Sequence, residues 1–320
     1  MTTNPEKSVT IQRMNYKGWP DAYRLSNGAA EVVVVPAIAR VMRFAFVGGP
    51  NLIWENPAAL GTPAKAGEWP NYGGEKAWPW PQDDWGKRLP SAWPPPTGAD
   101  DVPHAATVVG NDTVRLVSPV VAGYGVRIVR EVTLVSYAAR VTIRTRLEKV
   151  EGEPVPIAPW VILQTPVPTS PLVARLTGKS PLPEGWKTLA EGAWKRVERQ
   201  GNLLYIERVP APSAKLGFDG DALAAVFGDA LLKVVATPET THGFLPGERG
   251  QVYSNADSDE DKKRGVEPYV EWEFTAPLRP LKTGEASTLV TEWDLTRLPE
   301  GGALNAAEAA TALADPAAQP

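Results

Sequence analysis

The sequence predicts an all-β protein. Of its 320 residues, 33 are proline and 28 are glycine, and short runs of β-branched and aromatic residues recur between turn sequences. This spacing is typical of antiparallel β architectures. Strands do not alternate with long amphipathic helices, which argues against a doubly wound α/β fold. We therefore expect a single domain over residues 9–299, followed by a tail over residues 300–320.

The clearest strand is expected over Arg140–Glu148, with the sequence RVTIRTRLE. Val141, Ile143, Thr145 and Leu147 share one side of it, and charged or polar residues occupy the other. A period of two places one side against a core and the other toward solvent or a cleft. Further strands are expected over Ala30–Val35, Val41–Val47, Val114–Val117, Tyr124–Val135, Trp160–Gln164, Leu203–Val209, Ala222–Phe227, Leu231–Ala236, Tyr269–Thr275 and Thr288–Trp293.

Turn sequences separate many of these runs, among them Ser26-Asn27-Gly28 and Gly110-Asn111-Asp112. The tail from Gly301 is rich in alanine and lacks large apolar side chains. Helix propensity alone allows a short, marginal helix at Leu304–Ala314. The rest of the tail is expected to be disordered.

An unusual segment lies between Trp69 and Pro96, with five tryptophans and seven prolines. Each proline removes a backbone donor and fixes φ, so we expect a long irregular loop. Its indoles either fill core volume or line a ligand pocket, and both uses can coexist. Flat aromatic rings beside polar groups suit the apolar faces and hydroxyl rims of sugars. The candidate ligand contacts here are Trp78, Trp80, Trp85, Lys76 and Glu75.

Composition excludes several functional classes. The formal net charge is only -4, which offers no basic surface for nucleic acid and no polybasic stretch for a membrane surface. No apolar run approaches the roughly 18 residues of a membrane helix. With no cysteine, disulfides, thiolate metal sites and a cysteine nucleophile are ruled out. The start of the sequence has no apolar core typical of a secretion signal, so a cytoplasmic location is expected, although a trimmed signal would leave the same start.

The segment YVEWEFT over Tyr269–Thr275 offers the best acid–base surface. On a strand, Tyr269, Glu271 and Glu273 share one side, with neighbours roughly 6.6 Å apart. Two carboxylates and a phenol in a row can move protons or bind hydroxyl groups. The alternative is a solvated strand face whose charges only maintain solubility.

The two histidines, His104 and His242, could each transfer protons near neutral pH, or each could simply be a hydrogen-bonded loop residue. The acidic run from Asp257 begins like a calcium loop. It has Lys262 where that loop needs glycine and Pro268 where it needs glutamate. No metal and no cofactor are therefore expected.

Several sequence segments, which follow one another in the same order, resemble the galactose mutarotase-like, or aldose 1-epimerase-like, superfamily. They are the strand pair of Tyr23–Asn56, the phrase GQVYSN over Gly250–Asn255, and LKTGEASTLVTEW over Leu281–Trp293. The segments GGEKAWPWP and Trp93–Pro96 most resemble a bacterial branch defined only as a domain of unknown function. The resemblance spans most of residues 20–295 and implies a β-supersandwich of large antiparallel sheets with a sugar site on a concave face.

The resemblance also implies site residues. Glu271 falls where the epimerases carry their catalytic base, and Tyr253 lies in the matching GQVYSN phrase. Members of that family carry one histidine in a His-Gly-Gly phrase and a second in an Asn-His-x-Tyr-Phe-Asn phrase. Here the second histidine phrase is replaced by APWVILQT, which has no histidine and places Trp160 and Gln164 in that neighbourhood. The proton donor is therefore in question, and His242, Tyr269 or Asp83 could replace it.

Two functions follow as hypotheses. The first is an isomerase acting at a sugar's anomeric centre, with Glu271 as base, His242 as partner, and Trp78, Trp80, Trp85, Lys76, Glu75, Trp160, Gln164, Tyr253 and Glu273 contacting the substrate. The second is a non-catalytic carbohydrate-binding domain with a tryptophan-lined cleft. Either predicts a carbohydrate partner and a monomer or weak homo-oligomer.

Overall fold

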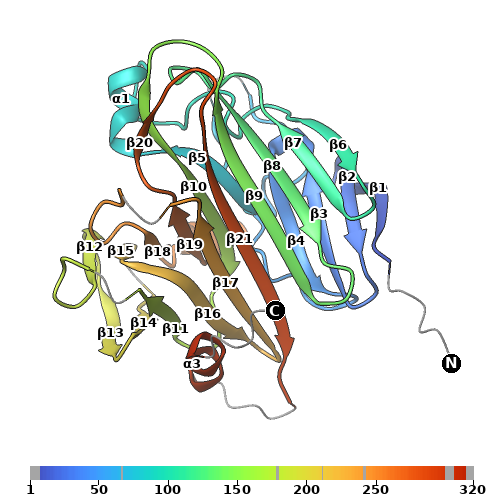
Figure 1. Ribbon diagram of the computed structural model, residues 1–320. Coiled ribbons are helices and arrows are strands. Elements are labelled where there is room, and N and C mark those ends of the chain that lie inside the picture. The colour runs from blue at the N-terminus through green and yellow to red at the C-terminus, as the bar shows by residue number, and fades with distance from the viewer. Residues whose placement is uncertain are drawn as a thin grey trace, which may run out of the picture.

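The computed structural model describes residues 8–65, 68–177, 180–210, 212–240, 243–299 and 306–314. Within these residues the chain forms two large antiparallel sheets, which lie face to face (Figure 1). The expected all-β class, a supersandwich of large antiparallel sheets, is confirmed. Among the described residues no helix is long and apolar enough to cross a membrane.

The first sheet has eleven strands within the described residues. In spatial order they are β1 (Thr10–Tyr16), β2 (Trp19–Ser26), β3 (Ala30–Val35), β4 (Arg40–Phe46), β5 (Glu75–Trp80), β10 (Val155–Pro166), β19 (Tyr269–Thr275), β18 (Gly250–Ser254), β15 (Ala214–Phe218) and β12 (Trp186–Ala190), with β20 (Arg279–Leu281) paired to β10.

The second sheet has ten strands within the same residues. Their spatial order is β13 (Trp194–Gln200), β14 (Leu203–Arg208), β11 (Leu172–Leu176), β16 (Gly220–Phe227), β17 (Ala230–Pro238), β21 (Ala286–Arg297), β9 (Arg140–Lys149), β8 (Val126–Leu134), β7 (Thr113–Val117) and β6 (Ala105–Val109).

The main core lies between the two sheets. Phe44 of β4 contacts Trp293 of β21, and Trp272 of β19 contacts Phe227 of β16, with ring centroids 5.9 and 6.2 Å apart. The predicted alternation of β9 is confirmed, since Val141, Ile143, Thr145 and Leu147 are all buried. One side of each strand therefore serves the core, and the other side remains for function.

A turn predicted from sequence joins the two sheets. Asn27 Oδ1 accepts hydrogen bonds from the amides of Ala29 and Ala30, both at 2.9 Å, as expected for an Asn-Gly turn. Its Nδ2 donates to the carbonyls of Val135 and Ala138 beyond the end of β8. This side chain closes a local turn and also fixes the first sheet to the second.

The prediction of one irregular loop between Trp69 and Pro96 is wrong. β5 lies inside the first sheet between β4 and β10, and it includes Pro79. Pro79 faces Pro159 of β10, so neither proline has to donate a hydrogen bond to a residue opposite that also lacks an N–H. The pairing of β10 with β19 begins one residue after Pro159, and β5 meets β4 only near its start, at Glu75. Proline is tolerated in a strand when its donor would have no acceptor.

The helices are short. The 3₁₀ segments η1 (Pro36–Ile38) and η2 (Gln82–Asp84) and the helices α1 (Trp85–Arg88) and α2 (Asp259–Lys263) lie between strands. α3 (Ala307–Ala314) falls within the helix expected in the tail. It buries Ala309 and Leu313 against β11, β16 and β17, on the outer side of the second sheet (Figure 1). The remainder of the tail, expected to be disordered, lies outside the described residues.

Candidate functional site

Polar side chains gather on the side of the first sheet that faces away from the second sheet. Trp272 of β19 points into the core, so Glu271 and Glu273, which flank it, point the opposite way. This confirms the two-sided pattern predicted for YVEWEFT. We call the surface formed here the Glu271 face; it comprises Lys76, Trp160, Gln164, Lys215, Gln251, Tyr253, Tyr269, Glu271 and Glu273.

The strand register determines which of these side chains are neighbours. Glu271 pairs with Gln164 of β10 on one side and with Tyr253 of β18 on the other, and Lys215 of β15 is opposite Tyr253. The next row contains Lys76, Glu273 and Gln251, with Ile162 between the first two. Five strands that are distant in sequence therefore supply one continuous surface.

Glu271 is held at one oxygen and partly open to solvent. Its Oε1 accepts a hydrogen bond of 2.8 Å from Gln164 Nε2, and it lies 3.5 Å from Lys76 Nζ. The side chain is 15% exposed. A fixed but accessible carboxylate has the geometry required of a general base.

Glu273 is fully buried beside it. Its Oε2 accepts hydrogen bonds from Trp160 Nε1 and from Lys215 Nζ, both at 2.8 Å. Burial raises the pKa of the Glu273 carboxyl, and the Lys215 ammonium opposes that shift. Lys215 also lies over the Trp160 ring, 4.9 Å from its centroid. Glu273 therefore fixes Trp160 and Lys215 and is a poor candidate for direct chemistry.

Lys76 is the second fully buried ionisable group of this face. Its ammonium lies 4.9 Å from the centroid of the Trp78 ring, a favourable cation–π position. Burial lowers the pKa of Lys76, and the nearby Glu271 carboxylate opposes the shift. A lysine in this state can exchange a proton closer to neutral pH than an ordinary lysine.

Four polar atoms on the Glu271 face are buried and form no hydrogen bond with any described residue. Three are acceptors and one is a donor: Gln164 Oε1, Gln251 Oε1, Glu273 Oε1 and Lys76 Nζ. An unmade hydrogen bond at a buried polar group costs about 1–3 kcal/mol. Buried polar atoms of this kind need an explanation, and a polar ligand bound at the Glu271 face would supply the missing partners, so these four atoms are the main evidence for a site here.

Two buried residues extend the charged surface beyond β5. Arg40 of β4 donates from Nη2 to Asp100 Oδ2 at 2.7 Å, and Trp69 Nε1 donates to Asp100 Oδ1 at 3.1 Å. Sequence reasoning missed Arg40, Asp100 and Lys215. Lys215 sits in the alternating run AKLGF, which was a usable signal, whereas nothing in the acidic loop around Asp100 singles out that residue.

The five tryptophans between Trp69 and Pro96 form a single cluster with Trp160 of β10. Trp78 contacts Trp69, Trp85, Trp93 and Trp160 with ring centroids 5.4–6.0 Å apart. Trp78 and Trp85 are buried, so they fill core volume. Trp80 is only partly buried and lies 5.2 Å from the Trp160 ring, while Trp93 is 48% exposed. Of the predicted ring contacts on β5 and α1, Trp80 is the one that remains accessible.

Other predicted residues lie away from the Glu271 face. Glu75 points between the two sheets, is buried, and forms an ion pair with Arg130 of β8. His104 is buried, its Nε2 lies 3.2 Å from the Gly98 carbonyl oxygen, and burial lowers its pKa to about 4. Asp83 belongs to η2, after β5. His242 lies outside the described residues.

Tyr269 and Tyr253 lie at one edge of the Glu271 face. Their rings are 6.3 Å apart, and the Tyr269 ring also contacts Trp54 at 4.4 Å. Burial raises the pKa of both phenols, and the Glu271 charge adds to the shift. Beyond Trp54 is an open hollow of about 350 Å³, bordered among others by Lys17, Asn51 and Glu55.

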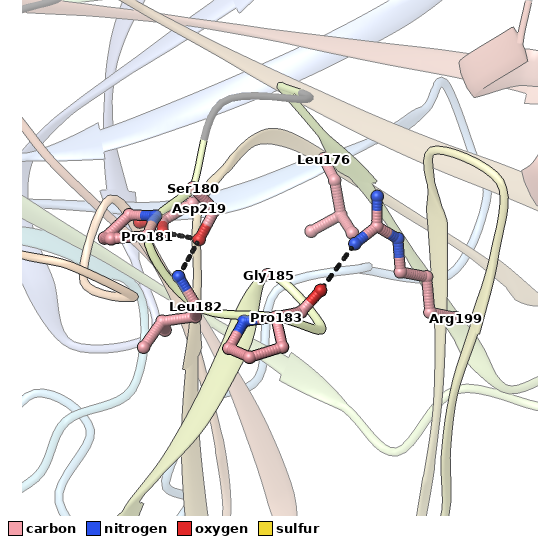
Figure 2. Close-up of a pocket in the computed structure, with 8 residues that line it drawn as sticks. All are labelled: Leu176, Ser180, Pro181, Leu182, Pro183, Gly185, Arg199 and Asp219. Carbon is pink, nitrogen blue, oxygen red and sulfur yellow. Dashed lines mark hydrogen bonds between the residues drawn. The ribbon is translucent and has the colours of Figure 1, made fainter.

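Figure 2 shows another hollow, next to β11 and β15. Ser180 donates to Asp219 and accepts from the Leu182 amide, and Arg199 Nη1 donates to the Pro183 carbonyl at 3.1 Å. Because these polar groups satisfy one another, this hollow has the character of loop packing. Among the described residues no group of three or more metal-binding side chains is placed to hold a metal ion.

No protein-family model matches the sequence, and no curated protein matches it in sequence. The backbone, however, is similar to several solved structures. A candidate mutarotase from Salmonella typhimurium, YeaD, superposes with a TM-score of 0.58 at 11% identity, covering 92% of this chain and 95% of that chain. A galactose mutarotase-like protein from Lactobacillus casei gives a TM-score of 0.57 at 9% identity, covering 86% and 100%.

A TPR-domain containing protein from Parabacteroides distasonis gives a TM-score of 0.57 at 13% identity, and the match covers 87% of this chain. This chain spans 47% of that protein's length. At such identities the likeness establishes the fold alone. The fold is galactose mutarotase-like, which confirms at the level of architecture the resemblance found in the sequence.

Proposed function

We propose that the Glu271 face binds a carbohydrate and that Glu271 acts as a base at its anomeric centre, so that the protein interconverts sugar anomers. The observation that carries this proposal is the set of four buried polar atoms around Glu271 that form no hydrogen bond with any described residue. A sugar offers hydroxyl groups that both donate and accept, which suits three free acceptors and one free donor on a single surface.

Aromatic rings support the choice of a sugar among polar ligands. The partly buried Trp80 ring lies beside Trp160, which is hydrogen-bonded to Glu273 within the Glu271 face. An aromatic ring contributes apolar contact area for the C–H face of a pyranose, while the neighbouring polar atoms bind its hydroxyl groups.

The interconversion of anomers requires one base and one proton donor. The carboxylate of Glu271 takes the proton from the anomeric hydroxyl, the bond between C1 and the ring oxygen breaks, and the ring oxygen takes up a proton. Rotation about the C1–C2 bond and closure in the reverse order give the other anomer. Glu271 is suited to the first step because Gln164 orients it while part of its carboxylate stays accessible.

Replacing Glu271 with glutamine tests the proposal. Glutamine keeps the size of the side chain but cannot take a proton, so we expect anomer interconversion to slow by about 100- to 10,000-fold. Rates are measured by NMR exchange spectroscopy on a panel of aldoses and aldose phosphates. The matched control is Glu153→Gln, at an exposed glutamate after β9, which should retain the native rate. Equal rates for native protein and Glu271→Gln would end the proposal.

A second function, carbohydrate binding without turnover, is favoured by the absence of the family's second histidine phrase, where this chain has Trp160 and Gln164. It predicts measurable heats in calorimetry with a glycan panel and no anomer exchange. Trp80→Ala should then weaken binding by about two- to tenfold, as expected for the loss of one aromatic contact. A panel that gives no heat with native protein would rule out this alternative.

A further inference from the structure

We propose that Lys76 is the proton donor to the ring oxygen of the sugar. In the family that the sequence resembles, a histidine would be expected in this role, but this chain has none at that place. This inference rests on the proposed function of Glu271. It concerns the other half of the reaction, because ring opening needs an acid as well as a base.

The position of the Lys76 ammonium carries the inference. Nζ lies 3.5 Å from the oxygen of Glu271 that Gln164 holds, yet it forms no hydrogen bond with any described residue. A lysine ammonium has three N–H donors, and burying them without acceptors is costly. We infer that the acceptor for these donors is an oxygen atom bound at the accessible part of Glu271, whose side chain is 15% exposed while that of Lys76 is 0% exposed. In a sugar, the anomeric hydroxyl and the ring oxygen are bonded to the same carbon, so a base and an acid this close can serve both atoms together.

The surroundings of Lys76 lower the pKa of its ammonium group, so its proton is easier to transfer than that of an exposed lysine. Burial disfavours the ammonium and lowers its pKa, whereas Glu271 and Glu273 on β19 and Asp100 favour the charged form. Arg40 of β4 opposes them. Glu75, the preceding residue, points to the other side of the sheet and forms its ion pair with Arg130. No other cation of the described Glu271 face lies within 4 Å of Glu271.

The proton balance closes within one turnover. Glu271 takes the proton of the anomeric hydroxyl as the bond from C1 to the ring oxygen breaks, and the electron pair of that bond goes to the ring oxygen. Lys76 gives this oxygen a proton and becomes neutral. After rotation about C1–C2, ring closure returns the ring-oxygen proton to Lys76, and Glu271 protonates the new anomeric oxygen.

Two substitutions separate a proton donor from a simple positive charge. Lys76→Met removes both properties. Lys76→Arg keeps the charge, but a guanidinium does not give up its proton near neutral pH. For a proton donor we expect both variants to lose about 100- to 10,000-fold in kcat, with a much smaller change in KM. Lys263→Met, at an exposed lysine of α2, is the control and should behave like native protein.

The pH profile is the second measurement. Native kcat should fall at high pH as Lys76 loses its proton, at a pH below the ordinary lysine value of about 10.4, because burial lowers this pKa. That alkaline limb should be absent from the residual activity of Lys76→Met. Far-UV circular dichroism and thermal unfolding verify that each variant is folded.

The possible results are distinct. The inference is supported if native protein is active, if both Lys76 variants are slowed, and if Lys76→Met loses the fall in kcat at high pH. A Lys76→Arg variant within threefold of native shows that charge alone is needed and overturns it, while leaving the role of Glu271 intact. A Lys76→Met variant at the native rate overturns it in the same way. If native protein exchanges no anomer of any aldose, the proposed function and this inference fall together.

Discussion

Arg130→Met is expected to lower the free energy of unfolding by about 3–5 kcal/mol. Arg130 of β8 and Glu75 of β5 form an ion pair between the two sheets, and both side chains are 1% exposed. Arg130 Nη1 also donates to the Ala39 carbonyl at 3.1 Å. Without Arg130, the Glu75 carboxylate stays buried but loses its ion-pair partner and the nearby charge that opposes its desolvation most. Urea unfolding of native and variant protein measures the difference.

The pH dependence of this loss has a definite sign. Burial raises the pKa of Glu75, with Arg130 opposing the shift, so removing Arg130 raises that pKa further. A raised carboxyl pKa means that stability is retained while the group is protonated and is lost as the pH rises through the folded-state pKa. The destabilisation should therefore be smaller at pH 5 than at pH 8.

Two variants serve as controls for the ion pair. Arg127→Met, at an exposed position of the same strand, should change stability by less than about 0.5 kcal/mol. The double variant Arg130→Met with Glu75→Leu should recover most of the loss, because neither member of the ion pair is then left buried without the other. A double variant that is as unstable as Arg130→Met alone would contradict this explanation.

Trp85→Ala is expected to cost about 3–5 kcal/mol as well. Trp85 is fully buried, lies 5.5 Å from Trp78, and donates from Nε1 to the Pro79 carbonyl at 3.0 Å. Its removal leaves a cavity beneath β5, the strand that carries Lys76 and Trp80, and one carbonyl without its donor. Denaturant unfolding measures the loss of stability.

Trp93→Ala is the matched control for Trp85. Trp93 belongs to the same cluster and stacks on Trp85 at 6.3 Å, but it is 48% exposed. We expect it to cost well under half as much, because less apolar area leaves water when it folds. Equal losses at the two positions would show that the cluster does not act as core.

Most of the fold could be predicted from hydrophobic periodicity and from the turn sequences. Tyr269–Thr275 forms a strand with the predicted bounds and the predicted two sides, because Trp272 and its neighbours are large enough to specify the core side. β9 follows the same rule. The strand at Glu75–Trp80 was missed because proline argues against a central strand, and only the register shows that Pro79 and Pro159 face each other without using donors.

Only part of the candidate site could be predicted from the sequence. Glu271, Gln164, Trp160 and Tyr253 came from segments of the sequence. The strand register makes Gln164 and Tyr253 neighbours of Glu271, whereas Trp160 pairs with Thr275 and hydrogen-bonds to Glu273. Lys76 and Glu75 are adjacent in sequence, and both were predicted to contact the ligand, but they point to opposite sides of β5. Because no strand was predicted over these residues, the side to which each of them points could not be predicted. The contributions of Arg40, Asp100 and Lys215 depend on pairing between distant segments, which a single sequence does not reveal.

A crystal structure of the Glu271→Gln variant soaked with an aldose that native protein interconverts tests the central claim most directly. We predict a pyranose on the Glu271 face, with its anomeric oxygen within hydrogen-bond distance of residue 271 and its ring oxygen within hydrogen-bond distance of Lys76 Nζ. A sugar bound at another surface, such as the hollow in Figure 2, with the Glu271 face unchanged, would contradict the account.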